Sequence, residues 1–96
     1  MSKISLVAII RAKKESGECV RSELSKLVAP TRKEDGCIEY NLHQDNDAPE
    51  VFVFYEIWEG AAYLEKHLSS DHYRKCGNAI VGMIEEKFVH KLTHIE

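Results

Sequence analysis

Two segments of this chain are apolar on both alternating sets of side chains, and this pattern limits the folds open to it. In residues 4–12 both the even-numbered and the odd-numbered positions carry aliphatic side chains, and residues 51–58 are aromatic and aliphatic in the same way. Successive side chains of a strand point to opposite faces of a sheet. The two segments are therefore predicted to be central strands of a sheet that is covered on both faces.

The remaining periodicities predict helices on either side of a strand pair. Apolar residues recur at helical spacing between residues 20 and 31, Pro30 is expected to break or restart that helix, and Gly36 ends it at positive φ. A strand, a short helix, a longer helix and a closing strand follow over residues 37–43, 61–68, 72–86 and 88–95. The order βαββαβ is the ferredoxin-like arrangement. We thus expect a single α+β domain over residues 1–96, with an antiparallel sheet and helices on one face.

A second copy of the chain is the simplest cover for the other face of this sheet. Two helical segments cover only one face of a four-stranded sheet, whereas residues 4–12 and 51–58 are apolar on both. A large exposed apolar face marks an interaction surface. We predict a homodimer in which two sheets pack face to face and the free face of each sheet closes a cavity.

Composition bounds the partners and the compartment. Thirteen Lys and Arg against sixteen Asp and Glu give a formal net charge of −3, which argues against nucleic acid and against an anionic membrane surface. The apolar N-terminal run is too short to span a bilayer and is followed at once by basic residues, so it is read as a strand. Three cysteines without a CxxC pair predict buried thiols rather than disulfides, and a cytoplasmic protein.

Glu56 is the one charged residue in the otherwise apolar segment 51–58. A buried carboxylate needs a partner or a raised pKa, so Glu56 is either a base or polar anchor in an apolar pocket, or a structural ion-pair partner of Arg11 or Lys91. Alternation places three aromatic residues on the same face as Glu56, and we expect that face to line the cavity with the polar set of the preceding strand. The candidate cavity residues are then Phe52, Phe54, Glu56, Trp58, Asn41 and His43.

Two histidines, His67 and His72, flank a Ser-Ser-Asp break between the last two expected helices. The break can bring both imidazoles to one edge of the sheet, although their spacing does not place them on one helix face. Imidazole titrates near neutral pH, so both are candidate proton-transfer groups; the alternative is a histidine that bonds loop backbone. His67 and His72 are five residues apart and so form neither an HxH nor an HxxxH pair, and the cysteines offer no partner spacing for a zinc site. We expect neither a metal nor another cofactor.

Three segments taken together resemble the antibiotic biosynthesis monooxygenase (ABM) family. They are Glu34-Asp35-Gly36-Cys37-Ile38-Glu39-Tyr40, Phe54-Tyr55-Glu56-Ile57-Trp58, and the run from His67 to Tyr73. The combination of E-x-G-C-x-x-Y, E-x-W and a histidine nine residues after the tryptophan is fairly specific for the family, and the resemblance covers nearly the whole chain. It implies a dimeric α+β barrel, in agreement with the dimer expected from the strands.

The resemblance implies oxygenation without metal or flavin. In such enzymes an electron-rich phenol or quinol is deprotonated, and the substrate anion itself reduces O₂ in a dry pocket. Carried over to this chain, Trp58 would wall the cavity, His67 would transfer the proton, and Glu56 would orient a partner or the substrate. Further binding candidates are Asn41, His43, His72 and Tyr73.

Other functions stay open within the same family. Haem-degrading relatives carry an asparagine in the first strand, which residues 5–10 lack, and this argues against a haem role. The isomerase of the phosphorylated autoinducer-2 signal is similar over His72-Tyr73-Arg74-Lys75-Cys76, which implies a non-redox reaction on a small polar metabolite. A dimer that binds a ligand without catalysis is the third alternative.

Overall fold

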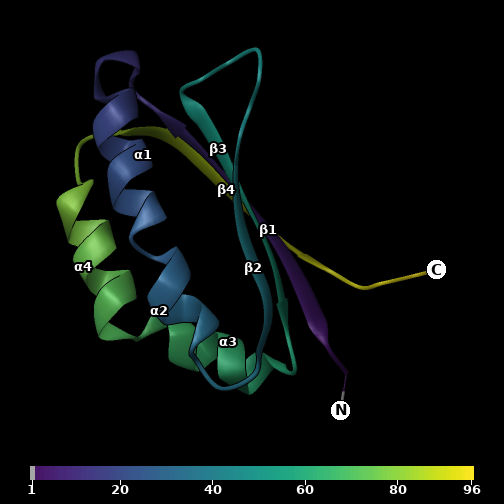
Figure 1. Ribbon diagram of the computed structural model, residues 1–96. Helices are drawn as coiled ribbons and strands as arrows, with labels where there is room; N and C mark the ends of the chain where they lie inside the picture. Colours follow the sequence, from purple (N-terminus) through teal and green to yellow (C-terminus); the bar gives the residue numbers. More distant parts are fainter. Residues whose placement is uncertain (1) are drawn as a thin grey trace.

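A four-stranded sheet with helices on one side forms the chain, and the computed structural model describes residues 2–96 of it. The elements are β1 (Ile4–Ala12), the short 3-10 turn η1 (Lys14–Ser16), α1 (Gly17–Ser25), α2 (Val28–Arg32), β2 (Cys37–Gln44), β3 (Val51–Trp58), α3 (Ala61–Leu68), α4 (Asp71–Ala79) and β4 (Ile84–Leu92). All four α-helices lie on the same side of the sheet (Figure 1). The ferredoxin-like α+β fold expected from the sequence is thereby confirmed.

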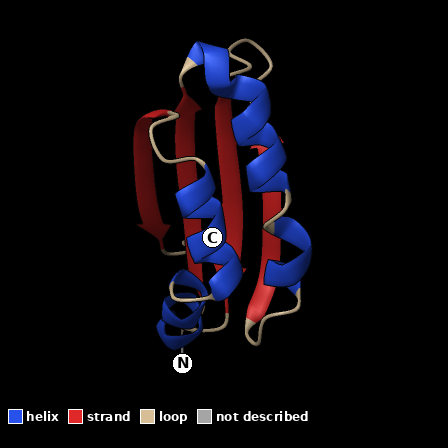
Figure 2. Ribbon diagram, turned by 90° about the vertical axis from the view of Figure 1, so that its left-hand side faces the viewer, coloured by secondary structure: helices blue, strands red, loops and turns tan. Residues whose placement is uncertain are grey.

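The two strands that are apolar on both faces occupy the centre of the sheet. The strand order is β2-β3-β1-β4, and every neighbouring pair is antiparallel. In this register Ile9 lies opposite Val53 on one side and opposite Phe88 on the other, so these three side chains share a face. Figure 2 shows the helices in front of the strands, and no helix of residues 2–96 lies behind the sheet.

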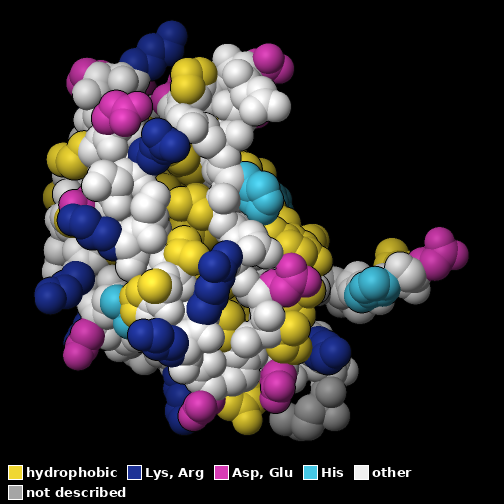
Figure 3. Space-filling view, viewed as in Figure 1, with side chains coloured by type: hydrophobic (Ala, Val, Ile, Leu, Met, Phe, Trp, Pro, Cys, Tyr) yellow, Lys and Arg dark blue, Asp and Glu magenta, His cyan; other side chains and the backbone are white. Residues whose placement is uncertain are grey.

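The hydrophobic core lies between the sheet and the helices. Its β1 members are Leu6, Ala8, Ile10 and Ala12, and its helical members include Val20, Leu24, Leu64 and Cys76. The opposite face of the sheet is also apolar but is only partly covered within one chain. It carries the half-buried or exposed side chains Val7, Ile9, Val53, Tyr55, Ile57, Phe88 and Leu92. In Figure 3 hydrophobic side chains are visible along the side of the molecule away from the helices.

Pro30 and Gly36 punctuate the first helical layer as expected. The helix ends after Ser25, and a second one starts at Val28, so that Pro30 falls in the first turn of α2, where its missing N–H costs no helical hydrogen bond. Gly36 has a φ of +79°, a conformation that favours glycine. A Cβ at Gly36 would also lie 2.2 Å from Cγ of Tyr63. The absence of that carbon allows the loop to pack directly against α3.

The predicted boundary between the last helix and the last strand was wrong. A helix was expected from 72 to about 86, whereas α4 ends at Ala79 and β4 already starts at Ile84. Gly82, with a φ of +80°, forms the turn, and Met83 donates from its N–H to the carbonyl oxygen of Ile80. Ile84 pairs with Ala12 across the sheet. Pairing with β1 therefore outweighs the helical spacing of the apolar residues here.

Two further expectations concern membranes and thiols. No helix within residues 2–96 is long and apolar enough to cross a membrane. All three cysteines are free, but they differ in exposure: Cys76 is buried, Cys37 is half-buried and Cys19 is exposed. The expectation of a buried thiol is thus confirmed for Cys76 and wrong for Cys19, which lies on the outer side of α1.

Candidate functional site

A short loop between α2 and β2 places the carboxylate of Glu34 under α3. The N–H of Glu34 donates to the carbonyl oxygen of Thr31 (3.0 Å), and its own carbonyl oxygen accepts from the N–H of Cys37 (3.3 Å). The carbonyl oxygen of Gly36 accepts from the N–H of Glu59 (2.8 Å), which ties the loop to the end of β3. Together with the packing of Tyr63 on Gly36, these bonds fix Glu34 beside the last turn of α3 and the first turn of α4.

One oxygen of Glu34 joins both candidate histidines. Oε2 lies 2.8 Å from Nδ1 of His67 and 2.6 Å from Nε2 of His72. His67 is in the last turn of α3 and is 1% exposed, while His72 is in the first turn of α4 and its side chain is 27% exposed. Ser70, the N-cap of α4, accepts from the N–H of Tyr73 and sets the angle at which the second helix starts. The Ser-Ser-Asp break thus brings the two imidazoles to one carboxylate.

The hydrogen bonds to Glu34 assign the tautomer of each histidine. An ionised carboxylate only accepts hydrogen bonds, so Nδ1 of His67 and Nε2 of His72 carry the protons. In the neutral imidazole of His67 the lone pair is then on Nε2, which has no hydrogen-bond partner among residues 2–96. This is the arrangement in which a carboxylate orients a histidine and stabilises its protonated form.

Aromatic rings surround the imidazole of His67. The ring centroids of Trp58, Tyr73 and Tyr40 lie 5.0, 5.0 and 5.4 Å from that of His67. Burial in this enclosure lowers the pKa of His67, and the hydrogen bond and charge of Glu34 oppose that effect by raising it. The net direction is downward, so His67 is neutral at physiological pH and able to accept a proton.

The carboxylate of Glu56 lies in the same layer and is bonded to Trp58. The indole Nε1–H donates to Oε1 of Glu56 at 2.9 Å, and both side chains are buried. Burial raises the pKa of Glu56, against the lowering effect of the Trp58 hydrogen bond. Burial, and secondly the charge of Glu56, likewise raise the pKa of Tyr40, which lies opposite Glu56 across β2 and β3.

The ion-pair alternative for Glu56 is not what the structure contains. Arg11 pairs instead with Glu50 at 3.0 Å and with Glu86 at 3.5 Å. Lys91 forms no salt bridge with Glu56 among residues 2–96. Glu56 is therefore a buried carboxyl with an indole as its hydrogen-bond partner, and not one half of a structural ion pair.

The predicted face of β3 was wrong. Phe52, Phe54, Glu56 and Trp58 were expected to line a cavity on the free face of the sheet, but all four are at most 5% exposed and lie under the helices. The register places Tyr40 opposite Glu56 and Leu42 opposite Phe54. Both faces of β3 are apolar, so its alternation alone does not decide which set is covered. The larger, aromatic set fills the thick layer between sheet and helices, and Phe52 and Phe54 are core residues there.

Asn41 and His43 consequently lie on the other face of the sheet from Glu56. They pair with Tyr55 and Val53, the open-face residues of β3. The amide of Asn41 accepts from Arg32 (3.0 Å) and donates to Glu39 (3.1 Å), while His43 is exposed. The structure therefore brings together Glu56, Trp58, His67, His72 and Tyr73, and it separates Asn41 and His43 from them.

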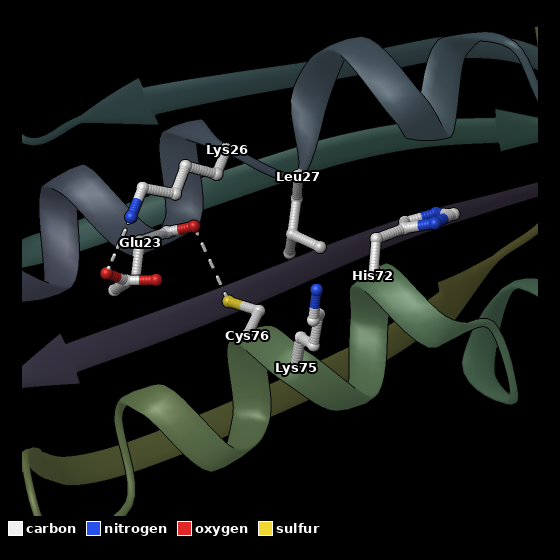
Figure 4. Close-up of a pocket in the computed structure, with 6 residues that line it drawn as sticks. All are labelled: Glu23, Lys26, Leu27, His72, Lys75 and Cys76. Atoms are coloured by element: carbon white, nitrogen blue, oxygen red, sulfur yellow. Dashed lines mark hydrogen bonds and ion pairs between the residues drawn. The ribbon is translucent and has the colours of Figure 1, made fainter.

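A groove between α1 and α4 reaches one member of this cluster, His72, from the surface (Figure 4). It has a volume of about 370 Å³ and is lined by Glu23, Lys26, Leu27, His72, Lys75 and Cys76. A smaller apolar pocket of about 60 Å³ shares Leu27 and Cys76 with the groove and reaches Tyr73. Tyr73 packs edge-on against His67, so it separates the pocket from the buried imidazole. The groove has the size of a small-ligand site.

Glu34 is the site residue that the sequence reasoning missed. It lies 33 residues before His67 and was read only as part of a helix end. The signal that could have identified Glu34 as a site residue was its position as the first residue of the E-x-G-C segment shared with the family. The ligand-type atoms of Glu34, His67 and His72 all lie within 4.8 Å of one another, so these three side chains also form a group that could hold a metal ion. Spacing between histidines alone gives no indication of such a grouping.

The fold and the buried cluster define a ferredoxin-like α+β protein with a candidate site under its helices. The family model described as antibiotic biosynthesis monooxygenase matches residues 3–79. The chain belongs to this family.

Relatives and solved structures agree with that assignment. A protein named "Probable quinol monooxygenase YgiN" from Escherichia coli K12 is 29% identical over 93 residues, which cover 86% of this chain and 89% of YgiN. Rv0793 of Mycobacterium tuberculosis is 31% identical over 72 residues, 75% of this chain and 70% of that protein. The crystal structure of PA3566 from Pseudomonas aeruginosa is 30% identical and superposes with a TM-score of 0.95 over 100% of this chain and 97% of that one.

Proposed function

We propose that the chain is a cofactor-independent monooxygenase that oxidises a small quinol or phenolic compound with O₂. The observation that carries the proposal is the imidazole of His67, which is surrounded by aromatic rings and held at Nδ1 by Glu34. A neutral imidazole with one free nitrogen is a suitable acceptor for a phenolic proton. Membership of the family and the name of YgiN support the same substrate class.

The reaction balances with O₂ as the co-substrate. His67 takes a phenolic proton at Nε2, and the resulting anion transfers one electron to O₂. The ring radical and superoxide then combine into a carbon–oxygen bond, and the O–O bond of this peroxide breaks. One oxygen atom stays on the ring and the other leaves as water, so that a hydroquinone and O₂ give a hydroxyquinone and water. The chain supplies a dry pocket and a proton carrier for these steps.

In this proposal Trp58 and Glu56 shape the wall of the pocket and take no direct part in proton transfer. The indole of Trp58 packs on His67 and donates to Glu56, so Glu56 fixes the ring against which the imidazole rests. A flat apolar substrate next to His67 would stack in the same layer. Tyr73, which lies between the apolar pocket and His67, has to turn aside to admit it.

The homodimer belongs to the same proposal. The open face of the sheet carries a continuous set of apolar side chains on β1, β3 and β4, and none of the helices in the described part of the chain covers it (Figure 1). A second copy placed sheet to sheet would bury these residues at the spacing usual for packed sheets. The site under the helices would then lie on the outer side of each half of the assembly.

Oxygen uptake with a series of hydroquinones and substituted phenols tests the function. We expect O₂ consumption that requires the folded protein, and incorporation of one atom of ¹⁸O from ¹⁸O₂ into the product. Hydrogen peroxide as the sole product would indicate an oxidase and would overturn the monooxygenase. Folding is checked in parallel by circular dichroism. Absence of uptake with any compound, or turnover that proceeds equally without oxygen, would favour the isomerase or the binding protein instead.

A further inference from the structure

The cluster of Glu34, His67 and His72 has the composition of a site for a divalent transition metal. Two imidazole nitrogens and one carboxylate oxygen converge, with all three ligand-type atoms within 4.8 Å of one another. Imidazole nitrogens favour Zn²⁺ and related ions over Mg²⁺ and Ca²⁺, which prefer oxygen ligands. Among residues 2–96, no other group of three histidine, cysteine or acidic side chains is found whose ligand atoms converge in this way.

The geometry requires only movements that the surroundings permit. A tetrahedral ion with bonds of about 2.0–2.1 Å holds its ligand atoms roughly 3.3–3.4 Å apart. The contacts of Oε2 of Glu34 with the two imidazoles, at 2.8 and 2.6 Å, would lengthen, and the two nitrogens would approach each other. His67 is fixed by burial, but the side chain of His72 is 27% exposed and that of Glu34 16% exposed. These two side chains can close around an ion.

The groove gives access to one of the three ligands. His72 is one of the residues that line it, and Figure 4 shows its imidazole at one end of the groove. An ion that arrives along the groove can therefore reach His72, whose side chain is 27% exposed and bonded to Glu34. In zinc sites with three protein ligands the fourth coordination position holds water.

We propose that Glu34, His67 and His72 bind one divalent transition-metal ion, with Zn²⁺ as the test ion, and that this ion switches off the proton acceptor. The switching half of the proposal rests on the proposed function. A metal at Nδ1 of His67 displaces the proton that Glu34 now holds there. The ion needs the lone pair of Nδ1, so the neutral imidazole takes the tautomer with its proton on Nε2; in this metal-bound form no lone pair remains for a phenolic proton.

Direct titration of the metal-free protein tests the binding half. After removal of bound metals with a chelator, Zn²⁺ is titrated by calorimetry, and Co²⁺ by its visible absorption, which reports tetrahedral coordination. We expect one ion per chain and a loss of affinity of at least about tenfold in both His72→Gln and Glu34→Gln. The matched control is His94→Gln, an exposed histidine near the C-terminus, which should bind like the wild type. Unchanged affinity in His72→Gln, or no stoichiometric binding in the wild type, would overturn the site.

Activity provides a separate readout of the switch. Zn²⁺ should abolish oxygen uptake with a hydroquinone and excess chelator should restore it. Stimulation by Fe²⁺ or Zn²⁺ would overturn both the switch and the cofactor-independent reaction. If no quinol is turned over at all, the proposed function fails while the metal site still stands or falls on the titration. The two failures are therefore distinguishable.

Discussion

The two faces of the sheet differ in what they do with polar groups. The helix-covered face holds two buried polar pairs: Trp58 donates to Glu56, and His67 donates to Glu34. On the open face the central strands carry apolar side chains such as Ile9 and Val53, which are only half-buried in one chain. The first arrangement changes proton affinities, whereas the second offers contact area.

This difference assigns separate roles to the two faces. Burial raises the pKa of Glu56 and lowers the pKa of His67, and such opposite shifts within one cluster are typical of sites for proton transfer. Among residues 2–96 the open face has no comparable buried titratable pair. We therefore expect substitutions under the helices to change the reaction, and substitutions on the open face to change association.

The largest expected effect is that of His67→Ala. Removal of the proton acceptor should lower the rate of oxygen uptake by about 10²–10⁴-fold, measured as kcat with the best hydroquinone. His94→Ala serves as the control, because His94 is exposed and distant in sequence from the cluster. A variant that is folded and as fast as the wild type would remove His67 from the mechanism.

The next effect concerns the open face, where β4 offers a matched pair. Phe88 and Val89 are adjacent and about equally exposed, at 51% and 49%, but they point to opposite faces. Phe88→Lys places a charge in the middle of the proposed dimer interface, and we expect it to weaken dimerisation by roughly 10²-fold or more. Val89→Lys should leave it unchanged.

Sedimentation velocity across a dilution series measures both variants. A wild type that sediments as a monomer at micromolar concentration would contradict the dimer altogether. Equal dissociation of the two lysine variants would contradict the assignment of the interface to the open face.

A smaller loss of activity is expected for Glu34→Gln. The amide no longer stabilises the imidazolium of His67, and we expect a rate loss of about 10–10²-fold. Because Glu34 raises the pKa of His67 against burial, the pKa should fall further in the variant. The acidic limb of the pH–rate profile, where His67 becomes protonated and inactive, should then move to lower pH. A profile that keeps its position would show that Glu34 does not act through His67.

Glu56→Gln should have the smallest effect, and one that depends on pH. The folded state raises the pKa of Glu56 above its ordinary value of 4.5, so the folded chain binds the proton more tightly than the unfolded chain does. The free energy of unfolding of the wild type therefore decreases as the pH rises from 4.5 through the folded pKa. Glutamine at this position still offers an oxygen that accepts the hydrogen bond from Trp58, and it carries no charge that would have to be buried. The free energy of unfolding of Glu56→Gln should therefore lack this pH dependence.

Urea unfolding at several pH values checks this expectation. The stability difference in favour of Glu56→Gln should be absent near pH 4 and should grow towards pH 8. A difference that is constant over this range would show that the fold does not raise the pKa of Glu56.

The sequence predicted the elements more reliably than their faces. Residues 4–12, 51–58 and 61–68 were placed with the correct bounds, because their patterns are long or are ended by Gly60 and Ser69. The end of α4 was predicted wrongly, because the apolar residues of 80–86 fit a helical spacing. Only the pairing of Ile84 with Ala12 in the folded sheet shows that a strand begins there. Tertiary pairing of this kind is not contained in a local pattern.

The site was predicted only in part, because some of its contacts also depend on tertiary structure. His67, Glu56 and Trp58 were identified from residue type, spacing and family resemblance, and the structure places them together under the helices. The face of β3 was predicted wrongly, because a strand that is apolar on both sides does not reveal which side the helices cover. Glu34 was missed because its partners follow it by 33 and 38 residues. Such contacts depend on the fold as a whole.

Oxygen consumption by the wild type and by His67→Ala, followed side by side with ¹⁸O₂ and a reactive hydroquinone, decides whether His67 serves a monooxygenase reaction. We expect uptake by the wild type, one ¹⁸O atom in the quinone product, and a rate in the variant that is lower by about 10²–10⁴-fold. Uptake that is equal in both folded proteins, or labelled hydrogen peroxide without labelled quinone, would contradict this role of His67.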